Sequence, residues 1–216
     1  MEYRLVRSDR KTIAIRVLSD GTVEVRAPKR APQSVIDEAL QKHGTWIQKH
    51  RANAVERYTP QIGKTAMLFG REFPLAAGRS TVLLEDKILL RYDSPPGIEL
   101  ARLYQRAASQ YFPGWLWELA GKEKLSYSGV KITSAKTRYG SCSGKNGICL
   151  SWRMACAPKR LIESVMLHEL CHTIHHDHGD GFWKEVYRRM PDYDQRTKEL
   201  SEWAKKWFFE ERENAE

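Results

Sequence analysis

The sequence contains no long apolar run. No stretch approaches the about 18 consecutive apolar residues that predict a transmembrane helix. Its first residues, "MEYRLVRSDRK", alternate charged with apolar side chains and lack the apolar centre of a signal peptide. We therefore expect a cytoplasmic protein without a membrane partner.

Cysteine is scarce, and a Walker-type glycine loop is absent. The cysteines form no Cys-x-x-Cys pair, which is the arrangement typical of a structural zinc knuckle. A disulfide framework is not expected in an intracellular chain of 216 residues. Without a glycine loop, binding of a phosphate would depend on Arg and Lys side chains. We interpret the four cysteines as reduced, mostly packed thiols, at positions 142, 149, 156 and 171.

The composition is that of a folded globular protein with a basic surface. Hydrophobic residues make up 41% and charged residues 29%, which excludes a disordered chain and leaves room for a substantial core. Lys and Arg outnumber Asp and Glu by 36 to 27, and this excess favours encounter with nucleotides or nucleic acid. The basic residues are spread along the chain, so they mark no groove, and nothing indicates the oligomeric state.

Apolar periodicity predicts an α+β fold in two parts, 1–92 and 93–216. The first part is β-rich, with a small antiparallel meander, one helix over about 34–58, and further short strands. Two prolines at 95 and 96 mark the expected boundary, because they interrupt a strand or a helix.

The second part is expected to be helical around a small sheet. Alternation predicts strands over 130–139 and 147–154, joined by the turn-rich "GSCSGKNG". Spacing of apolar residues at three and four predicts the helices. They are expected over 98–120 with a kink or break at Pro113, and over 158–175, 180–190 and 195–210.

The helix over 158–175 carries the motif His168-Glu169-x-x-His172. Residues four apart lie on one face of a helix, so the two histidines can bind one metal ion. Glu169 lies to the side of that pair, where its carboxylate can reach a water on the metal without being a ligand. The preceding apolar "LIESVML" carries the motif into the interior, where unpaired polar side chains are costly.

A third ligand must come from beyond this helix. His175 would point parallel to the first two histidines, so convergence requires the chain to turn within "HHDHG", where Gly179 tolerates left-handed geometry. We prefer His178 as the third ligand, and His176 and Glu185 remain alternatives. Phe182 and Trp183 are expected to pack the next helix against the first and so to hold His178 in place. Tyr193 is interpreted as an ordinary turn residue, and the alternative places it near the cleft as a proton donor or oxyanion partner.

One long segment resembles the YgjP-like predicted metallopeptidase family. It is "RYGSCSGKNGICLSWRMACAPKRLIESVMLHELCHTIHHDHGDGFW", and "RSDRKTIAIRV" and "WIQKHRA" are also similar, so the resemblance covers most of the chain. It implies a zincin-like core with one zinc ion on His168, His172 and His178, and Glu169 as the catalytic residue. The WLM and SprT-like proteases, which act on proteins attached to DNA, are related by motif. The chain departs from the family pattern at Ser151, where Asn is frequent, and at Tyr139, which replaces Trp.

Arg138 and Ser141 are candidate substrate-binding residues. They lie near the turn between the two expected strands, so a strand edge there would offer backbone groups to an extended substrate. Arg138 would then bind an anion or a carbonyl group. The other interpretation is a structural turn with a buried thiol.

Three functions follow from these features. The leading one is a zinc-dependent metallohydrolase, most simply a metallopeptidase acting on a protein or peptide. The second keeps the zinc but hydrolyses a nucleoside triphosphate, which the basic charge would attract. The third is a nucleic-acid-binding module with structural zinc, for which a fourth protein ligand is not evident.

Overall fold

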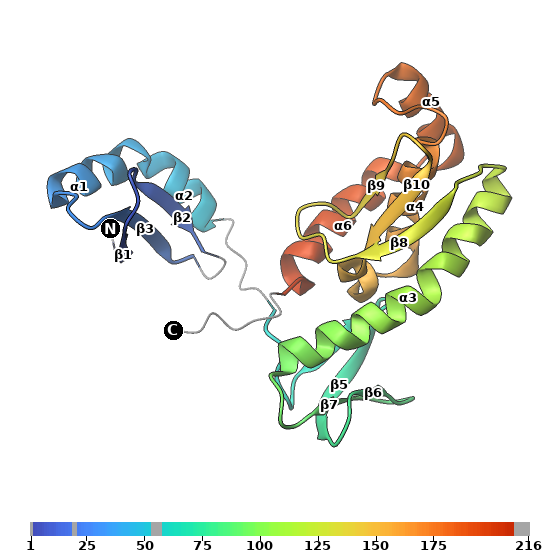
Figure 1. Ribbon diagram of the computed structural model, residues 1–216, viewed down its shortest axis with the longest axis horizontal. Coiled ribbons are helices and arrows are strands. Elements are labelled where there is room, and N and C mark those ends of the chain that lie inside the picture. The colour runs from blue at the N-terminus through green and yellow to red at the C-terminus, as the bar shows by residue number, and fades with distance from the viewer. Residues whose placement is uncertain (1, 19–20, 53–57, 210–216) are drawn as a thin grey trace. The chain divides into compact units, whose positions relative to one another are not determined.

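The computed structural model describes residues 2–18, 21–52 and 58–209, and it confirms the α+β class. The chain forms two compact units, Met1–Arg57 and Tyr58–Glu216 (Figure 1). The boundary expected between residues 92 and 93 therefore lies earlier, because the strands between 65 and 91 share a core with the helix that follows them. Pro95 is the N-cap of that helix and Pro96 its first residue, a position that suits proline, so they do not form a linker.

The N-terminal unit is a three-stranded sheet with two helices. Its elements are β1 (Arg4–Ser8), β2 (Ala14–Val17), β3 (Val23–Pro28), α1 (Gln33–Lys42) and α2 (Gly44–Ala52). The strand order is β1-β3-β2, and β1 pairs with β3 in parallel, so the expected antiparallel meander is wrong for that pair. The Arg7 guanidinium, on β1, donates hydrogen bonds to the carbonyls of Pro28, Lys29 and Ala31 at the end of β3, which stabilises this pairing.

The core of this unit is small and lies between the sheet and the helices. Val25, Ile36 and Ile47 are fully buried in it. The single helix expected over 34–58 is two helices, because α1 ends at His43, which caps it, and α2 begins at Gly44. Residues 53–57 of that expected helix lie outside the described residues.

The second unit begins with a four-stranded sheet that packs on a long helix. The sheet has the order β4-β5-β7-β6, and buried apolar side chains such as Leu75, Leu90 and Leu100 join it to the helix. The Tyr104 hydroxyl, fully buried, donates to the Met67 carbonyl. The elements are β4 (Thr65–Leu68), β5 (Arg71–Gly78), β6 (Val82–Leu83), β7 (Ile88–Arg91) and α3 (Pro96–Glu123).

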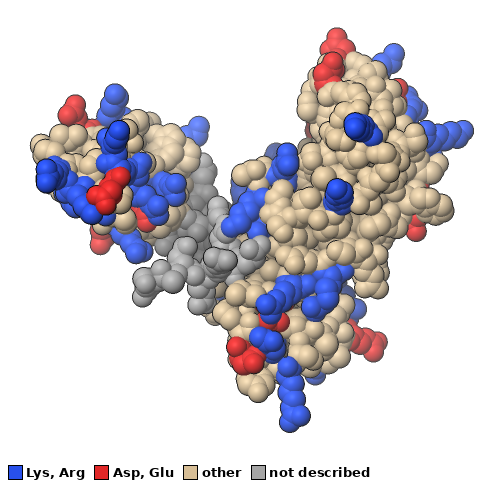
Figure 2. Space-filling view, viewed as in Figure 1, with Lys and Arg blue, Asp and Glu red and all other residues tan. Residues whose placement is uncertain are grey.

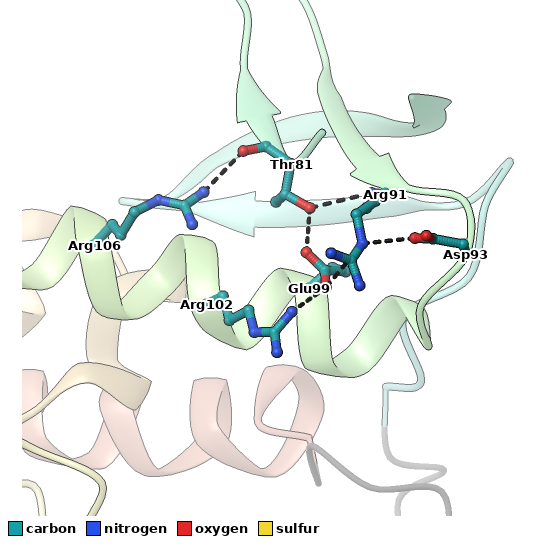
Figure 3. A network of polar contacts seen from close by, with 6 residues as sticks. All are labelled: Thr81, Arg91, Asp93, Glu99, Arg102 and Arg106. Carbon is teal, nitrogen blue, oxygen red and sulfur yellow. Dashed lines mark hydrogen bonds and ion pairs between the residues drawn. The ribbon is translucent and has the colours of Figure 1, made fainter. Parts of the chain in front are cut away.

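A polar network at the start of α3 strengthens this junction (Figure 3). Glu99 is only 3% exposed, and it accepts hydrogen bonds from Thr81 (2.5 Å) and Arg102 (2.5 Å). Arg91 lies 4.0 Å from the Glu99 carboxylate and also pairs with Asp93. Burial raises the pKa of Glu99, but the hydrogen bonds and the two arginines outweigh it, so the pKa lies below its ordinary value.

The remainder of the second unit carries the candidate site. A sheet of order β8-β10-β9 packs with α4, and α4 also contacts α3 and α6. α3 is one continuous helix through Pro113, so the break considered there is absent. Phe112 and Leu116, on either side of the proline, are fully buried. The elements are β8 (Gly129–Thr133), β9 (Gly140–Cys142), β10 (Gly147–Ser151), the 3₁₀ helix η1 (Trp152–Cys156), α4 (Lys159–Cys171), α5 (Asp180–Arg189) and α6 (Tyr193–Trp207).

Two local expectations differ from the structure in this part. The segment read as a turn between two strands contains the strand β9, which pairs antiparallel with β10. The second expected strand ends at Ser151, where the chain enters η1. In the described part of the chain, no helix is both long enough and apolar enough to cross a bilayer.

Candidate metal centre

Helix α4 carries the first three candidate residues into the interior. It begins after Pro158 and ends at Cys171, with His172 as its cap, so it is shorter than the expected helix over 158–175. Its apolar side chains are buried at Leu161, Ile162 and Leu170, which anchors the helix in the core. As a result Glu169 is 5% and His172 is 8% exposed, and both need polar partners.

Three imidazoles converge at the end of α4. The Nε2 atom of His168 lies 3.2 Å from Nε2 of His172 and 3.2 Å from Nε2 of His178. The ligand atoms of all three residues lie within 4.8 Å of one another. Two nitrogens bound tetrahedrally at 2.0–2.1 Å from zinc would be about 3.3 Å apart. The separations therefore match those of imidazoles that share one ion.

The other ring nitrogen of each helical histidine lies within hydrogen-bond distance of an oxygen atom. Nδ1 of His168 lies 2.8 Å from the hydroxyl of Tyr193, and Nδ1 of His172 lies 2.9 Å from the carbonyl of His175. A proton on each Nδ1 leaves a lone pair on each Nε2, which is the tautomer that a metal ligand needs. Burial, followed by the neighbouring histidines, lowers the pKa of His168 to about 4, so its ring is neutral at pH 7.

A tight turn after α4 brings His178 back to this face. Thr173 and Ile174 donate their N–H groups to the carbonyls of Leu170 and Cys171, three residues back. The Gly179 N–H donates to the Asp177 carboxylate, and α5 begins directly afterwards. Gly179 has φ −71°, so the left-handed geometry expected there is wrong. Successive short-range hydrogen bonds reverse the chain instead.

Aromatic side chains from α5 pack around the three imidazoles. Phe182 is fully buried and stacks on His172 with ring centroids 4.3 Å apart, and it contacts His168 and His178 edge-on. Trp183 lies against His178 at 5.8 Å. The expected packing of these two residues beside His178 is therefore present, and it restricts the rotation of the rings.

Glu169 lies on the side of α4 that faces β9. A Cβ atom on Gly140 would come within 2.6 Å of the Glu169 Oε1 atom, so only glycine leaves room for the carboxylate as it stands. Burial raises the pKa of Glu169 to about 7, and the positive charge of Arg138 opposes the rise. The Glu169 carboxylate also acts on Cys142. Burial raises the pKa of the Cys142 thiol most, and the negative charge of Glu169 raises it further.

The two candidate substrate-binding residues have different surroundings. Arg138 is exposed and close enough to Glu169 for its charge to act on that carboxylate. Ser141 lies in β9 between Gly140 and Cys142, and alternation along a strand directs its side chain to the opposite face. Only the backbone of Ser141 is thus available on the Glu169 side.

The alternative third ligands do not join the cluster. Among the described residues, the only group of three or more potential ligands within reach of one ion is His168, His172 and His178. Glu185 instead pairs with Arg188 at 3.0 Å and with Arg189 at 2.9 Å. His176 is exposed, and the ring of His175 lies against Gly181, where an added Cβ would be 2.9 Å from it.

Sequence reasoning left three contributors out of the predicted site. Tyr193 belongs to no recognised motif and lies 25 residues from His168 in the sequence, so no spacing rule assigns it to the site. Gly140 and Cys142 belong to a strand of three residues, too short to show alternation.

Comparisons with known proteins give one match that covers most of the chain. The model of the YgjP-like, metallopeptidase domain family matches residues 11–202. No curated protein matches the sequence.

Two solved structures are partly similar. The metallopeptidase zymogen of Pyrococcus abyssi abylysin is 18% identical, with a TM-score of 0.39 over 44% of this chain and 97% of that chain. The metallopeptidase zymogen of Methanocaldococcus jannaschii jannalysin is 19% identical, with a TM-score of 0.37 over 41% of this chain and 92% of that one. Both likenesses extend over less than half of this chain.

Proposed function

The chain belongs to the YgjP-like metallopeptidase family, and from this membership and the three converging imidazoles we propose a zinc-dependent peptidase. The observation that carries the proposal is the pair of 3.2 Å separations among the Nε2 atoms of His168, His172 and His178. Neutral imidazole nitrogens suit zinc, and three protein ligands leave a position open for substrate and water. One zinc ion per chain is therefore proposed.

The surroundings of the three histidines favour metal binding over a simple ring cluster. The Tyr193 hydroxyl and the His175 carbonyl can each accept a hydrogen bond from the Nδ1–H of a ligand histidine, and such a bond would fix the ring and its tautomer. With both Nδ1 atoms protonated and no ion present, the Nε2 lone pairs of the histidines would face one another in a half-buried place. That arrangement is costly, because these polar atoms would lack partners. The residues present thus fit zinc.

Glu169 is the proposed general base. When bound, zinc supplies Lewis acidity and brings the pKa of an attacking water towards about 7. Glu169 would take the proton from that water and pass it to the nitrogen of the leaving amine. A carboxylate with a pKa raised to about 7 by burial can both accept and return a proton near neutral pH.

The free edge of β9 is the proposed substrate-binding strand. β9 pairs with β10 on one side and ends the sheet on the other, and Gly140 brings its backbone next to Glu169. An extended peptide can add to such an edge through main-chain hydrogen bonds. Arg138, beside Glu169, would bind the substrate carbonyl oxygen and stabilise the negative charge that develops on it.

Glu169→Gln is the test of this mechanism, and Glu163→Gln is the matched control. Both residues lie on α4, but Glu163 is 30% exposed and pairs with Lys159 outside the site. We expect both variants to retain one zinc per chain, with cleavage of an unfolded protein substrate abolished by Glu169→Gln alone. Full cleavage by Glu169→Gln would contradict the mechanism.

The same preparations distinguish the nucleotide alternative. A panel of nucleoside triphosphates should yield no phosphate or pyrophosphate if the chain is a peptidase. Zinc-dependent release from a triphosphate, without any cleavage of protein, would assign the metal site to phosphohydrolysis instead. Salt-sensitive DNA binding with no hydrolysis of either kind would favour a structural metal.

A further inference from the structure

A groove in the N-terminal unit has no part in the metal site. We propose that this groove binds an extended polypeptide segment with a bulky apolar side chain and acidic neighbours. Binding itself does not depend on the metal site, and only the use of that binding for substrate capture rests on the proposed peptidase function.

The groove has a volume of about 420 Å³ and two unlike walls. One wall consists of Ile13, Ala14 and Ile15, which lead into and form the start of β2. The other consists of Ala39, His43 and Trp46, from α1, its cap and α2. The groove therefore lies between a strand and the connection of two helices.

The strand wall exposes backbone as well as side chains. Successive side chains of a strand point to opposite faces, so three consecutive residues can line one groove only along the edge of the strand. β2 is an edge of its sheet, since the order is β1-β3-β2. Within the described residues, β3 is the only strand that pairs with residues 14–17. The outward N–H and C=O groups of β2 are thus available to a further strand.

The helical wall supplies an apolar anchor point. Ala39, His43 and Trp46, from α1, its cap and α2, line the groove together. The Trp46 ring is 42% exposed and stacks on His50 with centroids 4.1 Å apart, which holds it in one position. A bulky apolar side chain of a bound strand would fit between this ring and Ile15.

Charge around the groove favours an acidic partner. Segments 11–16 and 38–49, which line it, contain four basic residues and one acidic residue. Within the described residues, no ion pair or hydrogen bond engages the side chains of Lys11, Arg16, Lys42 and Lys49. Figure 2 shows Lys and Arg side chains gathered on the face of this unit that it presents.

The lining favours a polypeptide over a nucleic acid. A phosphate backbone would need cations in the floor of the groove, but the lining is aliphatic apart from His43 and Trp46. A free strand edge beside a helical wall is instead the geometry that accepts an added β-strand. The cations that neighbour the lining residues in sequence would then contact acidic residues that flank the apolar anchor.

The consequence for a peptidase is selective capture of long, unfolded chains. A substrate held at the groove has a raised effective concentration at the metal site of the same chain. Polypeptides that contain the apolar-acidic segment should therefore have a lower KM than short peptides with the same scissile sequence. Their kcat should be the same, because the groove takes no part in the chemistry.

The test uses full-length protein carrying Glu169→Gln, so that binding is measured without turnover. The probe is a fluorescent Asp-Glu-Val-Phe-Val-Glu-Asp peptide, and its anisotropy gives the Kd. Trp46→Ala should weaken binding by at least about tenfold, as loss of an interface aromatic typically does. Ala39→Gln, which fills the groove with a neutral side chain and removes no contact, should weaken it similarly.

Val35→Ala is the matched control. Val35 is on α1 and 44% exposed, much like Trp46, but it does not line the groove. It should change the Kd by less than about twofold, since it contacts no bound strand. A peptide with Lys in place of Asp and Glu should bind more weakly than the acidic one.

Each result has one meaning for the groove. Equal binding by the parent protein, Trp46→Ala and Ala39→Gln would overturn the proposal. Displacement of the peptide by short oligothymidine that binds more tightly would overturn it too. Proteolysis without this binding would refute the groove alone. Binding without proteolysis in the otherwise unaltered protein would support the groove and refute the proposed function.

Discussion

Replacing Gly140 with alanine would displace the Glu169 carboxylate without touching a histidine. The added Cβ would lie 2.6 Å from Oε1 and 2.7 Å from Cγ of Glu169, whereas ordinary contact begins at 3.4 Å. The carboxylate or the strand must therefore move by about 0.7 Å, because two packed atoms cannot share that space. Gly140 has no positive φ, so the substitution adds no backbone strain of its own.

The displacement should reduce kcat and leave metal binding intact. A misplacement of about 1 Å in a catalytic group costs on the order of 100-fold in rate, so we expect a loss of about 10- to 100-fold. KM should change little, and zinc content should stay at one per chain. Overpacking costs about 1–3 kcal/mol of folding free energy, so thermal unfolding must show that the variant is folded at the assay temperature.

Gly144→Ala is the control, because a Cβ at Gly144 would meet no atom within 4 Å. Gly144 lies four residues after Gly140, in the connection between β9 and β10, and the Gly144→Ala variant should be as active as the unaltered protein. Full activity of Gly140→Ala would refute the inference that the position of Glu169 limits catalysis. Equal losses in both variants would trace the effect to the connection and not to Glu169.

Three further predictions concern metal binding and stability. Tyr193→Phe removes the hydroxyl that partners Nδ1 of His168, and it should weaken zinc binding about 10- to 100-fold in a chelator competition. An unchanged zinc affinity would rule out a positioning role for Tyr193. His178→Ala should weaken zinc binding more than Tyr193→Phe does. The control His176→Ala, at an exposed residue near His178, should leave zinc binding unchanged, and equal effects of the two alanine variants would contradict the ligand assignment. Glu99→Gln should lower the free energy of unfolding by about 1–3 kcal/mol at pH 7. Since the folded pKa of Glu99 lies below its ordinary value of 4.5, this deficit in the free energy of unfolding should shrink in urea titrations as the pH falls below 4.5. A deficit independent of pH would exclude the carboxylate as its source.

Local spacing predicted the helical half of the site, because helix geometry alone places residues four apart on one face. His168 and His172 needed no other information. His178 required a chain reversal, which was predicted within "HHDHG", but the left-handed geometry predicted for it is wrong. The turn uses short-range hydrogen bonds after α4 and an Asp177–Gly179 bond, which leave no glycine signature.

Contacts between distant segments were beyond the reach of sequence patterns. Tyr193 meets His168 only because the start of α6 packs near α4, and the parallel pairing of β1 with β3 skips the strand between them. The division between the two units also differs from the expected one, for a related reason. Proline at the start of a helix and proline in a linker look alike in sequence, and only the shared core of α3 with β4–β7 separates the two cases.

The most direct test of the central claim is X-ray absorption at the zinc edge of the purified protein. We predict about one zinc per chain with imidazole nitrogen scatterers at 2.0–2.1 Å, and with no sulfur shell. His172→Ala should lose that signal. A sulfur shell near 2.3 Å would place the metal on cysteine, and protein that binds no zinc at micromolar concentration would contradict the account of the three histidines.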